Sequence, residues 1–225
     1  MRRAPAVRDG LLVALTAAAG AVDAISYLGL GGIFTANMTG NMVLLALAAG
    51  SGAGPQALRA GVSLVAFSAG VFVAARIIRA PGDPSIWPRR ITTTLAVVAV
   101  LQGGVLAGWL ATSAHPTGAV EGGLIALSAL AMGAQGSAIR TMNVSGVSTT
   151  YLTGTLVGLV TQIAVWSGSR GERARRAGVL VALLAGAAVA AVLLTNARSL
   201  APILPLALTV SVVVIASAEL HERGL

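Results

Sequence analysis

The sequence predicts an all-α membrane protein with six transmembrane crossings and two re-entrant or broken helices, arranged as an inverted 3+3 internal repeat. Three observations lead to this prediction: the apolar composition, the positions of the arginines and a repeated polar stretch. Of the 225 residues, 56% are hydrophobic and 10% are charged, and the mean hydropathy is +0.87. A soluble domain carries about 25% charged residues. We therefore expect residues 1–225 to form a single integral membrane domain.

Apolar segments follow one another along most of the chain. They cover residues 11–29, 33–49, 57–78, 91–111, 122–139, 147–166, 177–194 and 200–218. A spanning helix needs about 20 residues, so several segments qualify by length. The first segment has the basic start of a signal peptide, but further apolar segments follow at once, and we interpret it as a retained span.

The basic residues decide how many segments cross. All 15 are arginines, and most form three clusters between apolar runs: Arg2, Arg3 and Arg8; Arg76, Arg79, Arg89 and Arg90; Arg170, Arg173, Arg175 and Arg176. If every segment crossed, these clusters would alternate between the two sides of the membrane, against the positive-inside rule. If one segment in each half does not cross, all three clusters lie on the cytoplasmic side, together with both termini.

The segments 33–49 and 147–166 are the best candidates for not crossing. Each begins with a stretch rich in Gly, Thr, Ser and Asn, at residues 31–41 and 145–155. Glycine and β-branched residues disfavour continuous helix. Irregular backbone at membrane depth is tolerated only where it faces protein or water. We expect an irregular, strand-like stretch followed by a short helix in each half.

The two polar stretches also resemble each other. Aligning residues 35–45 with 149–159 pairs identical residues at five positions, namely Thr35 and Thr149, Thr39 and Thr153, Gly40 and Gly154, Val43 and Val157, and Leu45 and Leu159. This similarity predicts a first repeat at 10–111 and a second at 121–219. Three crossings in each repeat would give the two repeats opposite orientations, as in many secondary transporters with discontinuous helices.

Asp23 is the one acidic residue well inside a predicted span. Burying a charge there costs at least about 2.5 kcal/mol, so it usually has a partner or faces a pathway. One hypothesis is proton or cation coupling, or an ion pair with a substrate. The alternative is a structural ion pair or a hydrogen bond between helices. Arg140 is a candidate partner for Asp23, or else a positive-inside anchor at a helix end.

The predicted solute-binding residues combine these groups with the polar stretches. Hydroxyl and amide side chains at a helix start either cap backbone N–H groups or present them to a ligand, and both interpretations stay open. The candidates are Asp23, Thr35, Asn37, Thr39, Gly40, Asn41, Gln135, Arg140, Thr149, Thr150, Thr153 and Gly154.

Several function classes are disfavoured by what the chain lacks. It has no cysteine, and its two histidines are far apart in sequence, which disfavours a metal site. It has no Walker loop, no G-x-S-x-G motif and no aromatic residues among the basic clusters. We therefore expect neither an enzyme, a cofactor nor a nucleic-acid partner. The expected partners are the lipid bilayer and an unidentified small solute or ion, and a homo-oligomer is compatible with the sequence.

Four short motifs point to a family. They are Gly20-x-x-Asp23-Ala24, Phe34-x-x-x-x-Thr39-Gly40-Asn41, Gly133-x-Gln135 and Thr149-Thr150-x-x-Thr153-Gly154. In combination they resemble the YoaK-like family of bacterial multi-pass membrane proteins, a domain-of-unknown-function family. The resemblance covers nearly the whole chain and implies a location in the bacterial inner membrane. Members often have Asn after the glutamine of the second half, where this chain has Gly136.

Together these features favour a small permease of the secondary-transporter kind, with a polar centre where the two repeats meet. A channel-like pore is one alternative, and a membrane scaffold or assembly protein that transports nothing is another.

The crossing number is testable with single cysteines, because the native chain has none. We expect a membrane-impermeant maleimide to label Ser113→Cys in intact cells, and to label Ser85→Cys and Ser169→Cys only after lysis. Different behaviour of the last two variants would mean an odd number of crossings between them, and would contradict the six-crossing arrangement.

Overall fold

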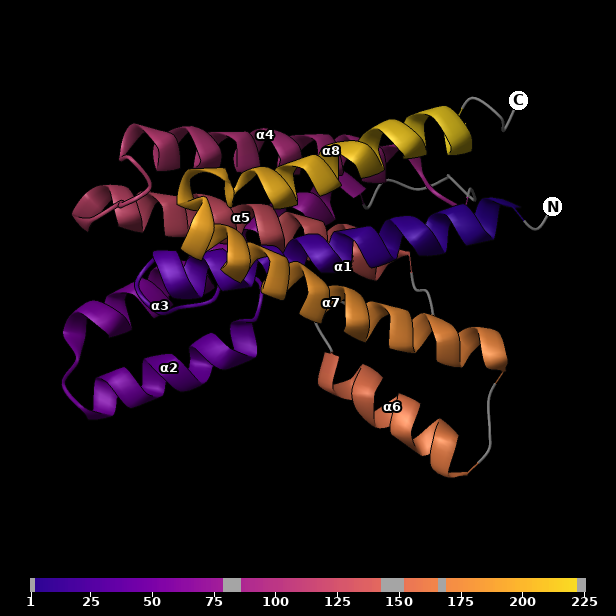
Figure 1. Ribbon diagram of the computed structural model, residues 1–225, viewed down its shortest axis with the longest axis horizontal. Coiled ribbons are helices and arrows are strands. Elements are labelled where there is room, and N and C mark those ends of the chain that lie inside the picture. Colours follow the sequence, from indigo (N-terminus) through magenta and orange to yellow (C-terminus); the bar gives the residue numbers. More distant parts are fainter. Residues whose placement is uncertain (1–2, 79–85, 143–151, 166–168, 222–225) are drawn as a thin grey trace.

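The computed structural model describes residues 3–78, 86–142, 152–165 and 169–221 (Figure 1). Within these ranges the regular secondary structure is entirely helical. The helices are α1 (Arg3–Gly29), α2 (Met38–Gly50), α3 (Gly54–Ile78), α4 (Arg89–Ala111), α5 (Gly118–Thr141), α6 (Leu152–Ala164), α7 (Arg170–Asn196), η1 (Arg198–Leu200), α8 (Ile203–Ala216) and η2 (Ser217–His221).

Helix length separates the elements into two groups. In the described parts of the chain, six helical runs of 23 to 27 residues are apolar enough to cross a membrane: α1, α3, α4, α5, α7, and the run Arg198–Leu220 that contains α8. Helices α2 and α6 have 13 residues each. Thirteen residues reach about 20 Å, which is short of a hydrocarbon core of about 30 Å. The predicted six long helices and two short ones are confirmed, while the inverted repeat stays a prediction.

The start of α7 differs from the expectation. The apolar run begins at Ala177, but the helix begins at Arg170, so the third arginine cluster is helical and does not form a loop. Ser169 caps the helix, because its Oγ accepts the backbone N–H of Glu172 at 3.1 Å. Arg176 then donates to Glu172 at 2.7 Å, one turn earlier on the same face. Capping and this ion pair extend the helix beyond the apolar segment.

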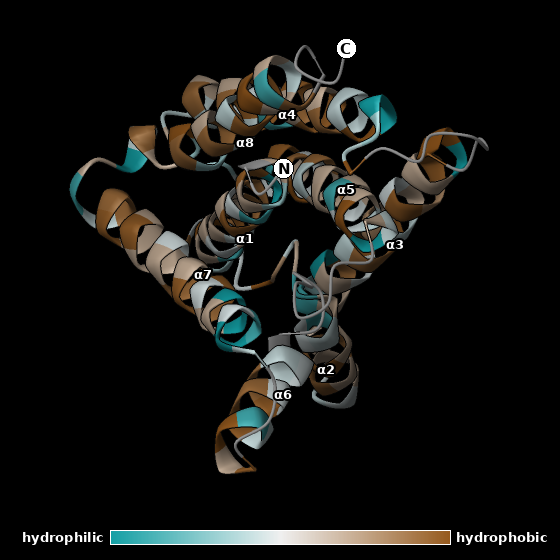
Figure 2. Ribbon diagram, turned by 90° about the vertical axis from the view of Figure 1, so that its right-hand side faces the viewer, coloured by the Kyte–Doolittle hydropathy of each residue, from teal (hydrophilic) through white to brown (hydrophobic). Residues whose placement is uncertain are grey.

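Helices α1 and α5 occupy the centre of the bundle. Figure 2 shows α3 and α7 on either side of them, with α4 and α8 together on one flank and α2 and α6 on the opposite flank. Helix α1 packs mainly on α7 and α8, whereas α5 packs mainly on α3 and α4. The backbones of α1 and α5 approach closely at few positions, although their side chains share one apolar core. The closest helix packing therefore defines two packing units, α1 with α6–α8 and α2–α5, which meet at this core and where α4 packs on α8. These units differ from the two halves of the sequence.

Each packing unit is held by a close crossing of two helices through glycine. A Cβ added to Gly70 of α3 would collide with the carbonyl of Leu130, and one added to Gly133 of α5 would collide with that of Phe67. Gly20 of α1 and Gly186 of α7 face the carbonyls of Leu183 and Ala17 in the same reciprocal way. Such small residues let helix backbones approach in a membrane, where apolar burial gives little net attraction.

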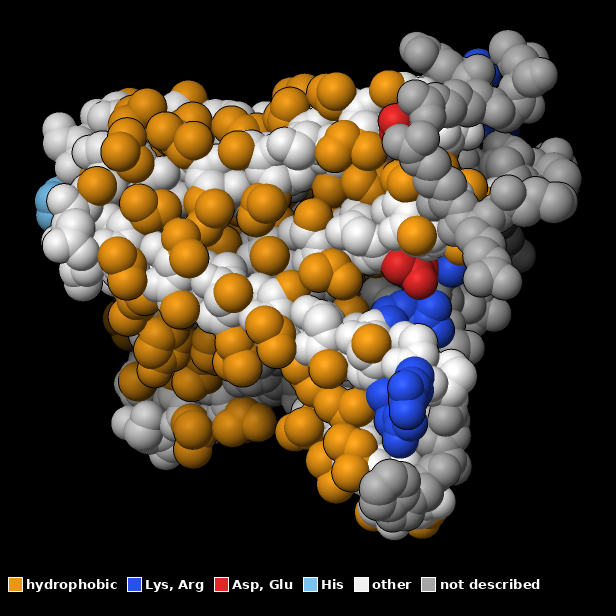
Figure 3. Space-filling model, turned by 45° about the vertical axis from the view of Figure 1, so that its right-hand side comes forward, with side chains coloured by type: hydrophobic (Ala, Val, Ile, Leu, Met, Phe, Trp, Pro, Cys, Tyr) orange, Lys and Arg blue, Asp and Glu red, His pale blue; other side chains and the backbone are white. Residues whose placement is uncertain are grey.

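The charged residues separate toward the ends of the bundle. The chain termini and most arginines lie at one end, here named the arginine-rich end; it holds Arg8, Arg76, Arg89, Arg90, Arg140, Arg170, Arg173, Arg175 and Arg176 (Figures 1 and 3). The opposite end carries Arg59 near the start of α3, Arg198 in η1, and His115 between α4 and α5. Figure 3 shows a histidine at that end in pale blue. Between the ends the surface is largely apolar, with Val65, Val100 and Leu184 each more than 60% exposed. This banding suits a protein surrounded by lipid.

A buried tryptophan stabilises each end of the core. Trp87 lies near the arginine-rich end and donates its Nε1–H to Thr92 Oγ1 at 2.9 Å. Trp109, near the opposite end, donates to the carbonyl of Arg198 at 3.0 Å, and the guanidinium of Arg198 lies 5.5 Å from its ring centroid. Both indoles thereby satisfy their polar group while filling the interior.

The glycine crossings generate a prediction. Gly133→Ala should destabilise the protein by about 1–3 kcal/mol, because the new methyl group overpacks the α3–α5 crossing. Gly103→Ala is the matched control, since nothing lies within 4 Å of a Cβ built at that glycine. Thermal unfolding in detergent measures both. Equal melting temperatures for the two variants would contradict close backbone contact between α3 and α5 at Gly133.

Candidate functional site

The chain reverses direction after α1 and returns into the bundle. Gly31 and Gly32 adopt φ angles of 75° and 74°, which glycine tolerates best. Gln56 of α3 holds this turn by donating its Nε2–H to the carbonyl of Gly32 at 3.1 Å. Residues 33–37 then run back along α1 without regular structure, and α2 leads outward again to the end where α1 finished. Residues 30–53 are therefore re-entrant, as predicted, although residues 30–37 are irregular and form no strand.

Asp23 anchors the deepest part of this segment. Its Oδ1 accepts the backbone N–H groups of Thr35, Ala36 and Asn37 at 3.0, 2.7 and 3.3 Å. Asp23 lies six residues before the end of α1, so these amides sit about 9 Å inside the helix end. Amides at that depth have little water to bond, and a carboxylate is a strong acceptor for them. The structure thus supports the structural interpretation of Asp23, with backbone amides as its partners.

Asn41 satisfies the preceding peptide groups. Its Oδ1 accepts the N–H of Phe34 at 2.9 Å, and its Nδ2 donates to the carbonyl of Phe34 at 2.6 Å. The same Nδ2 donates to Ser63 Oγ of α3 at 3.0 Å, and Ser63 donates to the Phe34 carbonyl at 2.8 Å. Asn41 is completely buried. One amide side chain therefore binds both polar backbone groups of Phe34 and joins α2 to α3.

Gly40 provides the space for the ring of Phe34. A Cβ at Gly40 would lie 2.9 Å from Phe34 Cδ2, and the ring stacks on Tyr27 of α1 with centroids 5.1 Å apart. Asn37 caps α2 by accepting the N–H of Gly40 at 3.3 Å. The spacing of Phe34, Gly40 and Asn41 therefore has a local explanation, because Phe34, just before α2, packs its ring on Gly40 and bonds its backbone to Asn41, both in the first turn of α2.

Thr35 joins the re-entrant segment to both central helices. Its Oγ1 lies 3.0 Å from Ser128 Oγ of α5 and donates to Ser26 Oγ of α1 at 3.4 Å. Gln135 acts separately: it is buried on α5 and donates its Nε2–H to the carbonyl of Leu15 on α1 at 3.1 Å. The structure thus brings Asp23, Thr35, Asn37, Gly40 and Asn41 together, and places Gln135 in an interhelical contact outside that cluster.

The remaining predicted residues lie elsewhere. Thr39 is exposed in the first turn of α2, as are Thr153 and Gly154 in that of α6. Thr149 and Thr150 lie outside the described residues. Arg140 lies in the last turn of α5, 22 residues or about 33 Å from the helix start at Gly118. It is therefore at the arginine-rich end, whereas Asp23 lies toward the opposite one.

The two short helices face each other on one flank of the bundle. In Figures 1 and 2, α2 and α6 lie on the same flank, and their N-terminal ends are turned toward each other. Helix α2 runs from there toward the end opposite the arginines, and α6 runs toward the arginine-rich end. The exposed polar side chains of Asn37, Thr39 and Thr153 lie at these facing ends. This point, midway along the bundle, is the candidate solute site.

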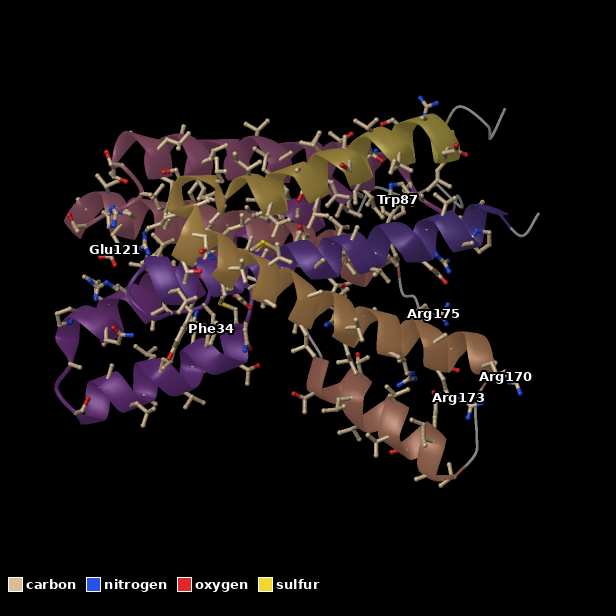
Figure 4. The ribbon with its side chains drawn as sticks, viewed as in Figure 1. Phe34, Trp87, Glu121, Arg170, Arg173 and Arg175 are labelled. Carbon is tan, nitrogen blue, oxygen red and sulfur yellow. The ribbon has the colours of Figure 1, made fainter. Side chains whose placement is uncertain are left out.

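An ion pair near the re-entrant turn was not anticipated from the sequence. Arg59 of α3 donates to Glu121 Oε2 of α5 at 2.9 Å, and the side chain of Glu121 is only 10% exposed. A Cβ at Gly31 would meet both side chains, so the pair also packs against the turn. Figure 4 shows Glu121 at the end of α5 opposite the arginines. The available signal was the position of both residues at the start of apolar segments, Arg59 in 57–78 and Glu121 just before 122–139.

Comparison with known proteins agrees with this architecture. Residues 11–216 match the family described as "Protein of unknown function (DUF1275)". The chain is 37% identical over 161 residues to the "UPF0700 transmembrane protein YoaK" of Bacillus subtilis (strain 168), which covers 72% of this chain and 69% of that relative. No solved structure matches the chain.

The anchoring of the re-entrant segment gives a test of Asp23. Asp23→Ala should destabilise the protein by at least about 3 kcal/mol, because three backbone N–H groups lose a charged acceptor. Asp23→Asn keeps an acceptor oxygen and should cost less. Asp9→Asn is the control for the lost charge: Asp9 pairs with Arg8 and Arg175 near the surface, where such pairs contribute about 0–1 kcal/mol. The melting temperatures of Asp23→Ala, Asp23→Asn and Asp9→Asn are measured in detergent. If Asp9→Asn lowers the melting temperature most, the anchoring role is refuted.

Proposed function

Because this chain belongs to the DUF1275 family and is a multi-pass membrane protein, we propose that it is a small permease of the secondary-transporter kind. The proposed pathway passes between the facing ends of α2 and α6. One observation carries the proposal: two helices too short to cross approach each other from opposite ends of the bundle, with polar N-terminal turns midway. Discontinuous helices of this kind form the substrate sites of many transporters.

Electrostatics suggests the class of solute. Each helix N-terminus carries the equivalent of about half a positive charge. An ionised Asp23 adds one negative charge beside the start of α2, where its Oδ1 binds Thr35, Ala36 and Asn37. The two dipoles and the carboxylate nearly cancel, so the centre attracts neither anions nor cations strongly. This balance, with the exposed Thr39 and Thr153 hydroxyls, favours a small, polar, uncharged solute.

The packing units suggest how access could alternate. Helices α1 and α6–α8 form one unit and α2–α5 the other, and each has its own glycine crossing. In this proposal the units rock against each other with the re-entrant segment between them, and the rocking must shift the α4–α8 contact and the apolar core that both units share. By the positive-inside rule the arginine-rich end is cytoplasmic, so both termini lie in the cytoplasm in this proposal. The proposed location is the bacterial inner membrane, which the family resemblance implies. Helix α2 then enters from outside and α6 from the cytoplasm.

A second candidate, a scaffold protein without transport activity, is favoured by a specific observation. Asp23, Thr35 and Asn41 are all engaged by hydrogen bonds within the protein. A structural role therefore accounts for these three side chains without any solute. The permease proposal consequently depends on the exposed groups at the facing helix ends, and the experiment is directed at them.

We predict solute flux through the purified protein in liposomes. The liposomes are incubated with a small-molecule extract of bacterial cells, and mass spectrometry identifies solutes that enter faster than into protein-free liposomes. Thr39→Val and Thr153→Val should each lower that flux at least tenfold, because both remove a hydroxyl from the facing ends. Thr195→Val is the control: its hydroxyl bonds to its own helix at the far end of α7.

The form of the flux separates the candidates. Saturation and counterflow indicate a carrier, whereas flux proportional to concentration indicates a channel-like pore. If the correctly folded protein takes up no solute, the scaffold is favoured. If Thr195→Val lowers the flux as much as Thr39→Val and Thr153→Val do, the facing helix ends are not part of the pathway.

A further inference from the structure

A small cavity lies behind the re-entrant segment, on the side away from α2 and α6. It is lined by residues of α1, α4, α5 and the start of α8, is partly open to the outside, and measures about 20 Å³. Most of its wall is apolar, but three polar side chains line it: Ser26 of α1, Gln102 of α4 and Ser128 of α5. Pro202 and Pro205 contribute the wall from α8. It is separate from the candidate solute site.

Gln102 is the unusual member of this wall. Its side chain is 5% exposed, and neither Nε2 nor Oε1 has a hydrogen-bond partner in the protein. An amide carries two donors and an acceptor, and burying such groups unpaired is strongly unfavourable. The chain therefore buries a complete amide beside a cavity whose other polar groups are two hydroxyls.

The volume of the cavity and its polar lining groups indicate which molecule fits in it. A water molecule needs about 10–15 Å³ of such space and two to four polar partners. A cavity of about 20 Å³ therefore has room for one water. We propose that a single ordered water occupies this cavity and bridges Gln102 to Ser26 and Ser128. This inference does not depend on the proposed permease function.

Such a water would lie at the junction of the two packing units. Ser26 belongs to the unit of α1 and α6–α8, whereas Gln102 and Ser128 belong to α2–α5. Ser26 and Ser128 are also the two partners of Thr35, at 3.4 and 3.0 Å. The water thus extends the hydroxyl cluster that holds the re-entrant segment, and connects it to α4. Gln102 supports the segment from behind without touching it.

Gln102→Met tests the proposal, because methionine has nearly the same shape and no amide. With the water present, the variant loses bridging hydrogen bonds and the melting temperature falls by a few degrees. Ser128→Ala then has a smaller effect in the Gln102→Met background than in the wild type, because the bridge is already broken. Ser137→Ala is the matched control, because Ser137 is a buried serine of α5, like Ser128, but lies outside the cavity. Its effect on the melting temperature should add to that of Gln102→Met.

A dry cavity gives the opposite results. Gln102→Met then raises the melting temperature by removing an unpaired amide, and its effect adds to that of Ser128→Ala. Gln102→Asn covers the case in which the methionine variant fails to fold, because it retains the amide and leaves room for water. A melting temperature near that of the wild type supports the proposal. A decrease in melting temperature as large as that of Gln102→Ala overturns it. A high-resolution density map is the direct check, with a peak within hydrogen-bond distance of Gln102 and Ser128 expected and an empty cavity contradicting it.

Discussion

The need to satisfy backbone polar groups inside a membrane governs the first half of this protein. Residues 33–37 run without regular structure beside α1, where water is scarce, so their amides require partners from side chains. Asp23 accepts three of them, and Asn41 binds both groups of Phe34. The position of α2, and with it one of the two facing helix ends, follows from these bonds.

Glycine packing determines which helices lie closest together. The reciprocal crossings pair α3 with α5 and α1 with α7, so each unit contains a helix from the opposite half of the chain. Thr35 contacts Ser26 of one unit and Ser128 of the other. The re-entrant segment consequently lies where the units meet, which makes it a sensitive position for any change between them.

Much of the candidate site was predictable as a set of residues but not as a set of interactions. The polar stretch at 31–41 and the isolated acid Asp23 both indicated a special region, and the structure brings them together. That the partners of Asp23 are backbone amides, and not Arg140, could not be inferred, because peptide groups are the same in every residue and leave no trace in the sequence. Likewise the partly buried Arg59–Glu121 pair depends on which faces of α3 and α5 meet.

The sequence by itself determined the membrane environment, the six long helices and the two short ones, because apolar run length and arginine placement record directly how much chain lies in lipid. Tertiary structure decided the exchange of helices between halves, the burial of Gln102 beside a small cavity and the use of Asp23 and Asn41 as backbone anchors. These features depend on which residues distant in sequence become neighbours, and in a chain so rich in Ala, Val, Leu and Gly many pairings look alike until the helices are packed.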